Sequence, residues 1–176
     1  MASFTERMIG AAKLDAATYE EVEADQNALG QAIGVVLIAA LASGIGALGA
    51  GISGLLGGLV AALVGWFVWA AIIFLVGTKV LPEPQTKADL GQLLRTMGFA
   101  ASPGIFNILG IIPFFGWIVR FAVMIWQLIA MVIAVRAALD YQNAVKAVLV
   151  CLIGWVAYMA AVFVLGSIIG LGAAFS

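Results

Sequence analysis

The sequence predicts an all-α integral membrane protein, a polytopic bundle of five transmembrane helices with short cytoplasmic amphipathic helices at one end. Of its 176 residues, 65% are hydrophobic and only 10% are charged, whereas about 25% of the residues of soluble domains are charged. A soluble chain of this size buries only about 70% of the surface that it exposes when unfolded. It could not remove so many hydrophobic side chains from water, so the composition indicates a membrane protein. In addition, the charges fall in clusters that are separated by uncharged runs long enough to cross a bilayer.

The uncharged runs define the predicted spans. A helix rises about 1.5 Å per residue, so about 20 apolar residues cross a hydrocarbon core of about 30 Å. The runs are too long and too uniformly apolar to be the alternating strands of a membrane barrel. We therefore divide the chain into a cytoplasmic N-terminal segment, residues 1–27, and a transmembrane domain, residues 28–176. The predicted spans of that domain are 28–48, 55–80, 93–112, 117–139 and 147–171.

The placement of the basic residues predicts the orientation. Five spans put the two termini on opposite sides of the membrane. With the N-terminus inside, Arg120 is the one residue of the eight Lys and Arg that lies on the outer side. This agrees with the rule that cytoplasmic loops are rich in basic residues. We expect a multi-pass protein of the cell (inner) membrane with a cytoplasmic N-terminus and an outward C-terminus, whose first span is an uncleaved anchor.

The N-terminal segment carries an apolar stripe. Phe4, Met8 and Ala11 or Ala12 recur at helical spacing, which predicts a short helix at the membrane interface. Residues 18–21 have the pattern of a capping box, which predicts a second cytoplasmic helix that leads into the first span. Phe4 and Met8 are therefore candidate lipid contacts, and the alternative is that the segment docks a soluble partner.

The connection after the second span contains a second amphipathic pattern. Residues 81–84, Leu-Pro-Glu-Pro, break the chain, and residues 86–89 again resemble a capping box. Apolar side chains then follow at i, i+3, i+4 and i+7, namely Leu90, Leu93, Leu94 and Met97. We predict a helix on the cytoplasmic surface that runs into the third span. Lys87 and Arg95 are candidate contacts for anionic headgroups, and anchoring of the bundle is the alternative role.

The third span is predicted to be broken at Pro103, because proline removes a backbone donor and clashes with the preceding turn. Ser102, Asn107 and Pro113 lie near this break. A broken membrane helix with polar groups can form a ligand or ion site, although it can equally be a packing kink that neighbouring helices cover. At the outer end of the fourth span, Arg120 can extend its charge to the interface and contact lipid or a partner chain.

Composition excludes most catalytic chemistry. The sequence contains no histidine and a single cysteine, Cys151, so neither a Ser-His-Asp triad nor an intramolecular disulfide can form. A formal net charge of −1 offers no basic patch for nucleic acid. We expect no catalytic site, no cofactor and no metal. The expected partners are membrane lipids and either other membrane chains or further copies of this one.

Short motifs in order along the chain resemble the Ypt-interacting-protein (Yip) domain family, in its prokaryotic form. They are residues 95–103, 112–116, 126–128, 136–140 and 144–147. The resemblance implies a small five-span protein with a cytoplasmic N-terminal segment. In eukaryotes it implies binding of Rab-type GTPases, but residues 1–27 contain no long Tyr/Pro-rich region, and we do not expect that binding here. The predicted function is a non-enzymatic scaffold, adaptor or accessory subunit, and the alternative is a small-solute transporter or channel that uses the broken third span.

Overall fold

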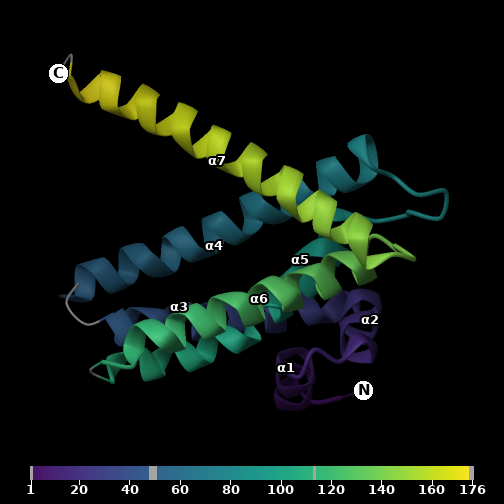
Figure 1. Cartoon of the computed structure of the whole chain (residues 1–176), viewed down its shortest axis with the longest axis horizontal. Helices are drawn as coiled ribbons and strands as arrows, with labels where there is room; N and C mark the ends of the chain where they lie inside the picture. Colours follow the sequence, from purple (N-terminus) through teal and green to yellow (C-terminus); the bar gives the residue numbers. More distant parts are fainter. Residues whose placement is uncertain (1, 48–50, 113, 175–176) are drawn as a thin grey trace.

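The computed structural model describes residues 2–47, 51–112 and 114–174, and within these ranges it is all-helical without strands (Figure 1). The prediction of an all-α protein is therefore confirmed. The elements in chain order are α1 (Phe4–Ala12), α2 (Ala16–Ala24), the 3-10 helix η1 (Gln26–Ala28), α3 (Leu29–Ala47), α4 (Gly51–Leu75), the π-helical turn η2 (Val76–Val80), α5 (Leu90–Phe99), the 3-10 helix η3 (Ser102–Ile111), α6 (Gly116–Ala138) and α7 (Ala144–Ala174).

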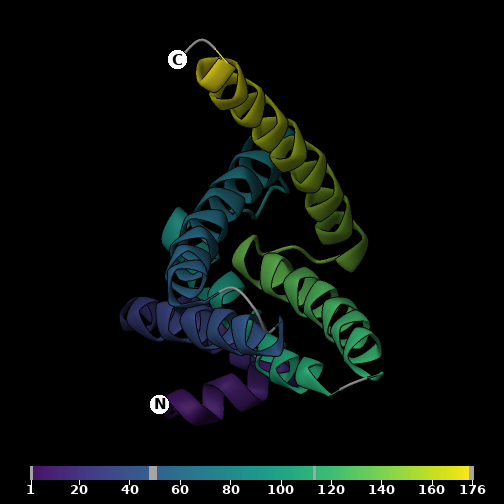
Figure 2. The same ribbon diagram turned by 90° about the vertical axis from the view of Figure 1, so that its left-hand side faces the viewer.

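Four long helices, α3, α4, α6 and α7, run roughly along the long axis of the molecule (Figure 1). In the view along these helices they form the sides of an open ring (Figure 2). α5 and η3 pack between them, and α1 and α2 lie against α5, α6 and η3. The short helices, the loop after η2 and the turn between α6 and α7 gather toward one end, on the right in Figure 1.

The described residues contain four helices that are long and apolar enough to cross a membrane, namely Gln26–Ile45, Leu55–Val80, Gly116–Ala138 and Ala144–Val164. These correspond to the predicted first, second, fourth and fifth spans. The predicted third span, 93–112, is not one long helix, because it consists of the ten-residue α5 followed by the ten-residue η3. The count of five spans is therefore not confirmed by helix length.

The predicted break at Pro103 also differs from what the structure contains. The α-helix ends at Phe99, before the proline, and Pro103 lies in the first turn of η3. Proline disfavours the α conformation of the residue before it, which here is Ser102. The Ser102 hydroxyl donates to the Phe99 carbonyl at 2.6 Å and so satisfies one of the acceptors at the end of α5.

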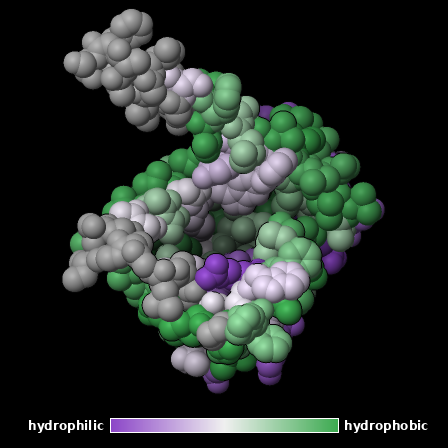
Figure 3. All heavy atoms as spheres, turned by 60° about the vertical axis from the view of Figure 1, so that its left-hand side comes forward, coloured by the Kyte–Doolittle hydropathy of each residue, from purple (hydrophilic) through white to green (hydrophobic). Residues whose placement is uncertain are grey.

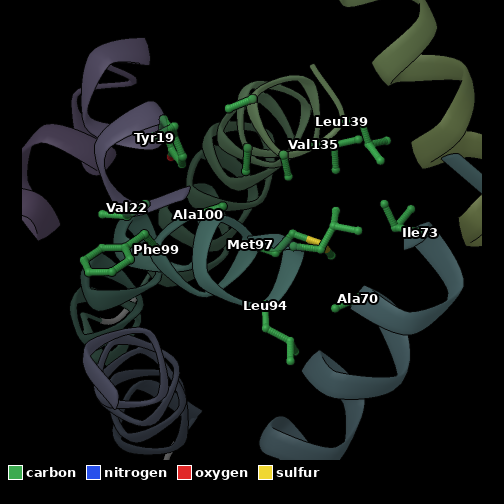
Figure 4. Packing of buried hydrophobic residues seen from close by; sticks show 14 of the residues in the cluster. Tyr19, Val22, Ala70, Ile73, Leu94, Met97, Phe99, Ala100, Val135 and Leu139 are labelled. Carbon is green, nitrogen blue, oxygen red and sulfur yellow. The ribbon is translucent and has the colours of Figure 1, made fainter. Parts of the chain in front are cut away.

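α5 is buried in the bundle, which corrects the prediction that it lies on the cytoplasmic surface. Residues 93–100 are all buried. Figure 4 shows Met97 and Leu94 of α5 directed toward α4, with Phe99 on another side near α2. Tyr19 and Val22 of α2 belong to the same core cluster, so the N-terminal helices share one core with the long helices.

Both predicted capping boxes lie three residues away from the true helix starts. α2 begins after Asp15, whose carboxylate accepts from the Ala17 amide at 3.2 Å. α5 begins after Asp89, which forms a reciprocal capping box with Gln92. An aspartate is at least as good an N-cap as a threonine, and in each segment the aspartate is the residue used. The threonines, Thr18 and Thr86, bond to neighbouring groups instead.

Candidate functional site

The end of the molecule that holds α1, α2, the loop 81–89 and the turn 139–143 carries most of the described ion pairs and polar contacts; we call it the charged end. Arg7 of α1 is one of its two buried charged residues, with Arg95, in the described part of the chain. The Arg7 side chain is only 1% exposed, and its guanidinium pairs with Glu21 at 2.9 Å and Asp25 at 2.8 Å. It also donates to Gln31 Oε1 at 3.1 Å. One side chain thus joins α1 to α2 and to the beginning of α3.

The electrostatics of this cluster favour the ionised carboxylates. Hydrogen bonds from Arg7 lower the pKa of Glu21 and of Asp25 below their ordinary values. A buried guanidinium is costly to remove from water unless its donors are satisfied. Here three side-chain acceptors surround it, so the charge is compensated within the protein.

Arg95 of α5 forms a second buried contact, at the C-terminal end of α2. Its guanidinium donates to the Val22 carbonyl at 3.1 Å and to the Glu23 carbonyl at 2.5 Å. Cations are favourable at this end of a helix because the last carbonyls lack intrahelical partners. Beside it, Gln92 Nε2 donates to the Glu23 carboxylate, and burial raises the pKa of that carboxyl, with repulsion from Asp140 adding to the effect.

The loop after η2 is tied to the turn between α6 and α7. The Thr86 hydroxyl donates to the Leu139 carbonyl at 3.0 Å, and Lys146 pairs with Glu83 at 3.5 Å. The Tyr141 hydroxyl lies 2.7 Å from the Leu81 carbonyl, and burial raises the pKa of Tyr141 to about 12. Lys87 is exposed on this loop, whereas Arg95 is buried, so these two predicted residues do not form one basic surface.

Two predicted residues of α1 seat this helix on the bundle. The Phe4 ring lies over Gly34 of α3, 3.8 Å from the position that a Cβ would take. Met8 and Ser102 line the same apolar pocket of about 290 Å³ between α1, η3 and α6. In the wall of this pocket, Trp126 Nε1 donates to the Ala12 carbonyl at 2.7 Å, which caps the C-terminal turn of α1.

The remaining predicted residues lie elsewhere. Pro103 is buried, and Asn107 Nδ2 donates to the Ser43 hydroxyl of α3 at 3.1 Å. Arg120 is exposed near the start of α6, away from the charged end. Pro113 lies outside the described residues. Ser102 and Asn107 thus bond to α5 and α3, and of the predicted candidates that the structure describes, Met8 and Ser102 line a pocket together.

Comparison with known proteins decides the family. A family model described as the Yip1 domain matches residues 15–166, which is most of the chain. The chain belongs to the Yip1 domain family. No curated protein and no solved structure matches it. The resemblance read from the short motifs is thereby confirmed.

The Yip1 domain match includes Glu21, Asp25 and Arg95, but it begins after α1. The buried Arg7 contact therefore joins a helix outside the matched region to two residues inside it. Sequence reasoning did not select Arg7 as a site residue. A signal was present, because Arg7 lies three residues after Phe4 and four before Ala11, on the same face as the predicted apolar stripe. In the described part of this Yip1 domain chain, no three His, Cys, Asp or Glu side chains cluster to hold a metal.

Proposed function

We propose that this protein is a non-enzymatic membrane scaffold or adaptor that binds another protein through its charged end. The observation that carries the proposal is the buried contact of Arg7 with Glu21 and Asp25. Membrane anchoring alone requires only an apolar face that rests on lipid. A pre-organised surface, by contrast, lowers the entropy that is lost on binding a partner, and the two buried arginines hold α1 and α2 in one arrangement.

The chemistry of the exposed face indicates the kind of partner. Glu6, Asp15 and Glu20 are exposed on α1 and α2, where Lys13 is the exposed basic residue. Complementary charge steers association and selects against wrong partners. We propose that this face binds a basic segment of a neighbouring protein, whereas the exposed Lys87 lies near anionic headgroups.

A photocrosslinking experiment in native membranes tests this function. A photoreactive amino acid at Glu20 should give one reproducible protein adduct, and Asp15→Asn, which removes the charge but keeps a good N-cap for α2, should weaken that adduct. The matched control carries the same probe at Val156, which is 62% exposed on α7 and should label only lipid. If the Glu20 probe also labels only lipid, the charged end does not bind a protein and the proposal is wrong.

In the proposed topology the chain crosses the cell (inner) membrane five times, and the charged end lies in the cytoplasm. Four crossings are the long helices, and the fifth is α5 together with η3. Ten α-helical and ten 3-10 residues rise about 35 Å, which is enough for a core of about 30 Å. η2, which contains Lys79, the loop that contains Lys87, and the start of α7, which contains Lys146, gather toward the same end (Figure 1), and Lys146 pairs with Glu83 of that loop. Basic residues gathered at one end support a cytoplasmic location of that end.

Reporter fusions test the topology. A reporter that is active only in the cytoplasm should be active when it is fused after Gln85 and after Gln142, and inactive when it is fused to the C-terminus. A four-crossing chain, in which α5 and η3 stay on one side, would bring the C-terminus back to the side of the N-terminus. Activity of the C-terminal fusion would therefore contradict the five-crossing proposal.

A further inference from the structure

A cleft of about 440 Å³ lies in the middle of the bundle, separate from the charged end. It opens between α3 and α6 on one side and α4 and α7 on the other, where these helices diverge (Figure 1). Figure 3 shows the hollow, whose rim ranges from green to pale lavender with a strongly hydrophilic group at its lower edge. Its volume is within the range of about 300–1,000 Å³ that is typical of small-molecule sites.

The cleft lies at mid-membrane depth. Gln127 is at the middle of the predicted crossing Gly116–Ala138, and Trp66 and Trp69 flank the middle of Leu55–Val80. None of the described side chains that line the cleft is charged. A charged headgroup would thus have no counter-ion at this depth, so the occupant must be neutral.

Aromatic side chains form much of the wall. Trp66, Trp69, Trp155 and Tyr158 line the cleft together with three methionines. Trp69 and Tyr158 meet edge to face, with ring centroids 5.7 Å apart. Aromatic rings and methionine sulfur offer flat, polarisable contacts that favour a planar ring over a flexible acyl chain.

The wall also contains hydrogen-bond donors that the described residues satisfy poorly. Trp66 Nε1–H is buried without an acceptor. Gln127 Nε2 donates to the Ala101 carbonyl at a long 3.5 Å, and no residue in the described part of the chain forms a hydrogen bond with the Tyr158 hydroxyl. A buried donor without an acceptor costs about 1–3 kcal/mol. Carbonyl oxygens on a ligand would supply the missing acceptors. An apolar helix from a second copy of this protein would not, because its backbone carbonyls are already bonded within the helix.

We propose that this cleft binds a quinone-like lipid, a planar uncharged ring with carbonyl oxygens and a long apolar tail. The ring stacks among the indoles, and its carbonyls accept from Tyr158 and Gln127, with Trp66 Nε1–H as a third donor after a small rotation of the indole. The tail leaves through the opening between the diverging helices. This site does not depend on the charged end or on a protein partner.

Binding of decylubiquinone to the full-length protein in lipid nanodiscs tests the proposal, with tryptophan fluorescence as the readout because a bound quinone quenches nearby indoles. We expect saturable quenching in the wild type. Tyr158→Phe and Gln127→Leu should each weaken the affinity about tenfold, which corresponds to the loss of about 1.4 kcal/mol. Gln26→Leu, which changes an exposed glutamine outside the cleft, should leave the affinity unchanged.

Photolabelling of the wild type with an azidoquinone tests the position of the site without any variant. We expect adducts on α4 around residues 62–69 and on α7 around residues 155–159. Labels spread over the outer, lipid-facing surface of α6, or quenching that rises linearly with quinone and is equal in all variants, would overturn the proposal. Displacement of the quinone by an equal concentration of diacylglycerol would identify an acyl-chain site and would also overturn it.

Discussion

We expect Arg7→Met to lower the free energy of unfolding by about 2–3 kcal/mol and to release α1 from the bundle. Removing one partner of a buried ion pair leaves the other charges without compensation. Asp25 is only 10% exposed in this contact, whereas Glu21 is 37% exposed and regains some solvation. The expected loss of stability is therefore smaller than for a fully buried pair. Thermal unfolding in detergent measures the stability, and limited proteolysis before residue 15 measures the release of α1.

Lys13→Met is the matched control, since it removes a charge at the C-cap of the same helix, in an exposed position. Such surface changes usually alter stability by less than about 0.5 kcal/mol. If the Arg7 and Lys13 variants unfold alike, the buried contact does not hold the N-terminal helices.

The effect of Arg7→Met should also depend on pH. Arg7 lowers the pKa of Glu21 and Asp25 in the folded state, so these groups contribute stability above their ordinary pKa values, near 4. That contribution is lost as the pH falls through the lowered values, where the carboxylates become protonated. The stability difference between wild type and Arg7→Met should thus be full at pH 7 and decrease as the pH falls below about 4. A difference that is constant from pH 7 to pH 3 would contradict the electrostatic origin of the contact.

The uncharged apolar runs predicted the four long helices, because about 20 such residues are enough for a helix to cross a bilayer. The spacing of apolar residues instead placed α5 on the surface, because Leu93, Leu94 and Met97 form one face and polar residues form another. In the structure that polar face is covered too, with Arg95 buried and Gln92 partly buried. Arg95 donates to the last carbonyls of α2, and Gln92 donates to Glu23. An amphipathic pattern shows which side chains are polar. It does not show that a helix far away in the sequence will provide the hydrogen-bond partners of those side chains.

Glycine motifs give a similar lesson. The sequence contains the pair Gly30-x-x-x-Gly34, a spacing that is typical of closely packed membrane helices because small residues let helix backbones approach. At Gly30, however, a Cβ would meet nothing within 4 Å. A tight approach of α5 to α3 lies instead at Gly98, which belongs to no Gly-x-x-x-Gly pair. Close contact depends on which surfaces meet in three dimensions, and the spacing of glycines in one helix does not determine that.

We therefore expect Gly98→Ala to be strongly destabilising although it adds one methyl group. An added Cβ would lie 2.7 Å from Ala32 Cβ and 3.2 Å from the Ala32 carbonyl oxygen, so α3 and α5 would have to separate. Overpacking of a buried contact costs about 1–3 kcal/mol. Because α5 lies at the centre of the core, the shift should extend to its neighbours. The midpoint of thermal unfolding, with near-ultraviolet circular dichroism of the tryptophans as the probe, measures this effect.

Two further variants isolate the cause. Gly30→Ala adds the same methyl group to α3 in open space, so it should leave stability unchanged or raise it by up to about 1 kcal/mol, since alanine favours the helix. Ala32→Gly in the Gly98→Ala background removes the nearest clashing atom and should restore part of the lost stability, although the contact with the carbonyl oxygen remains. A Gly98→Ala protein that is as stable as the Gly30→Ala protein would show that α3 and α5 do not pack this closely in the membrane. Glycine at position 32 costs the helix up to about 1 kcal/mol, so a double variant less stable than Gly98→Ala by more than this would show that the clash lies elsewhere than at Ala32.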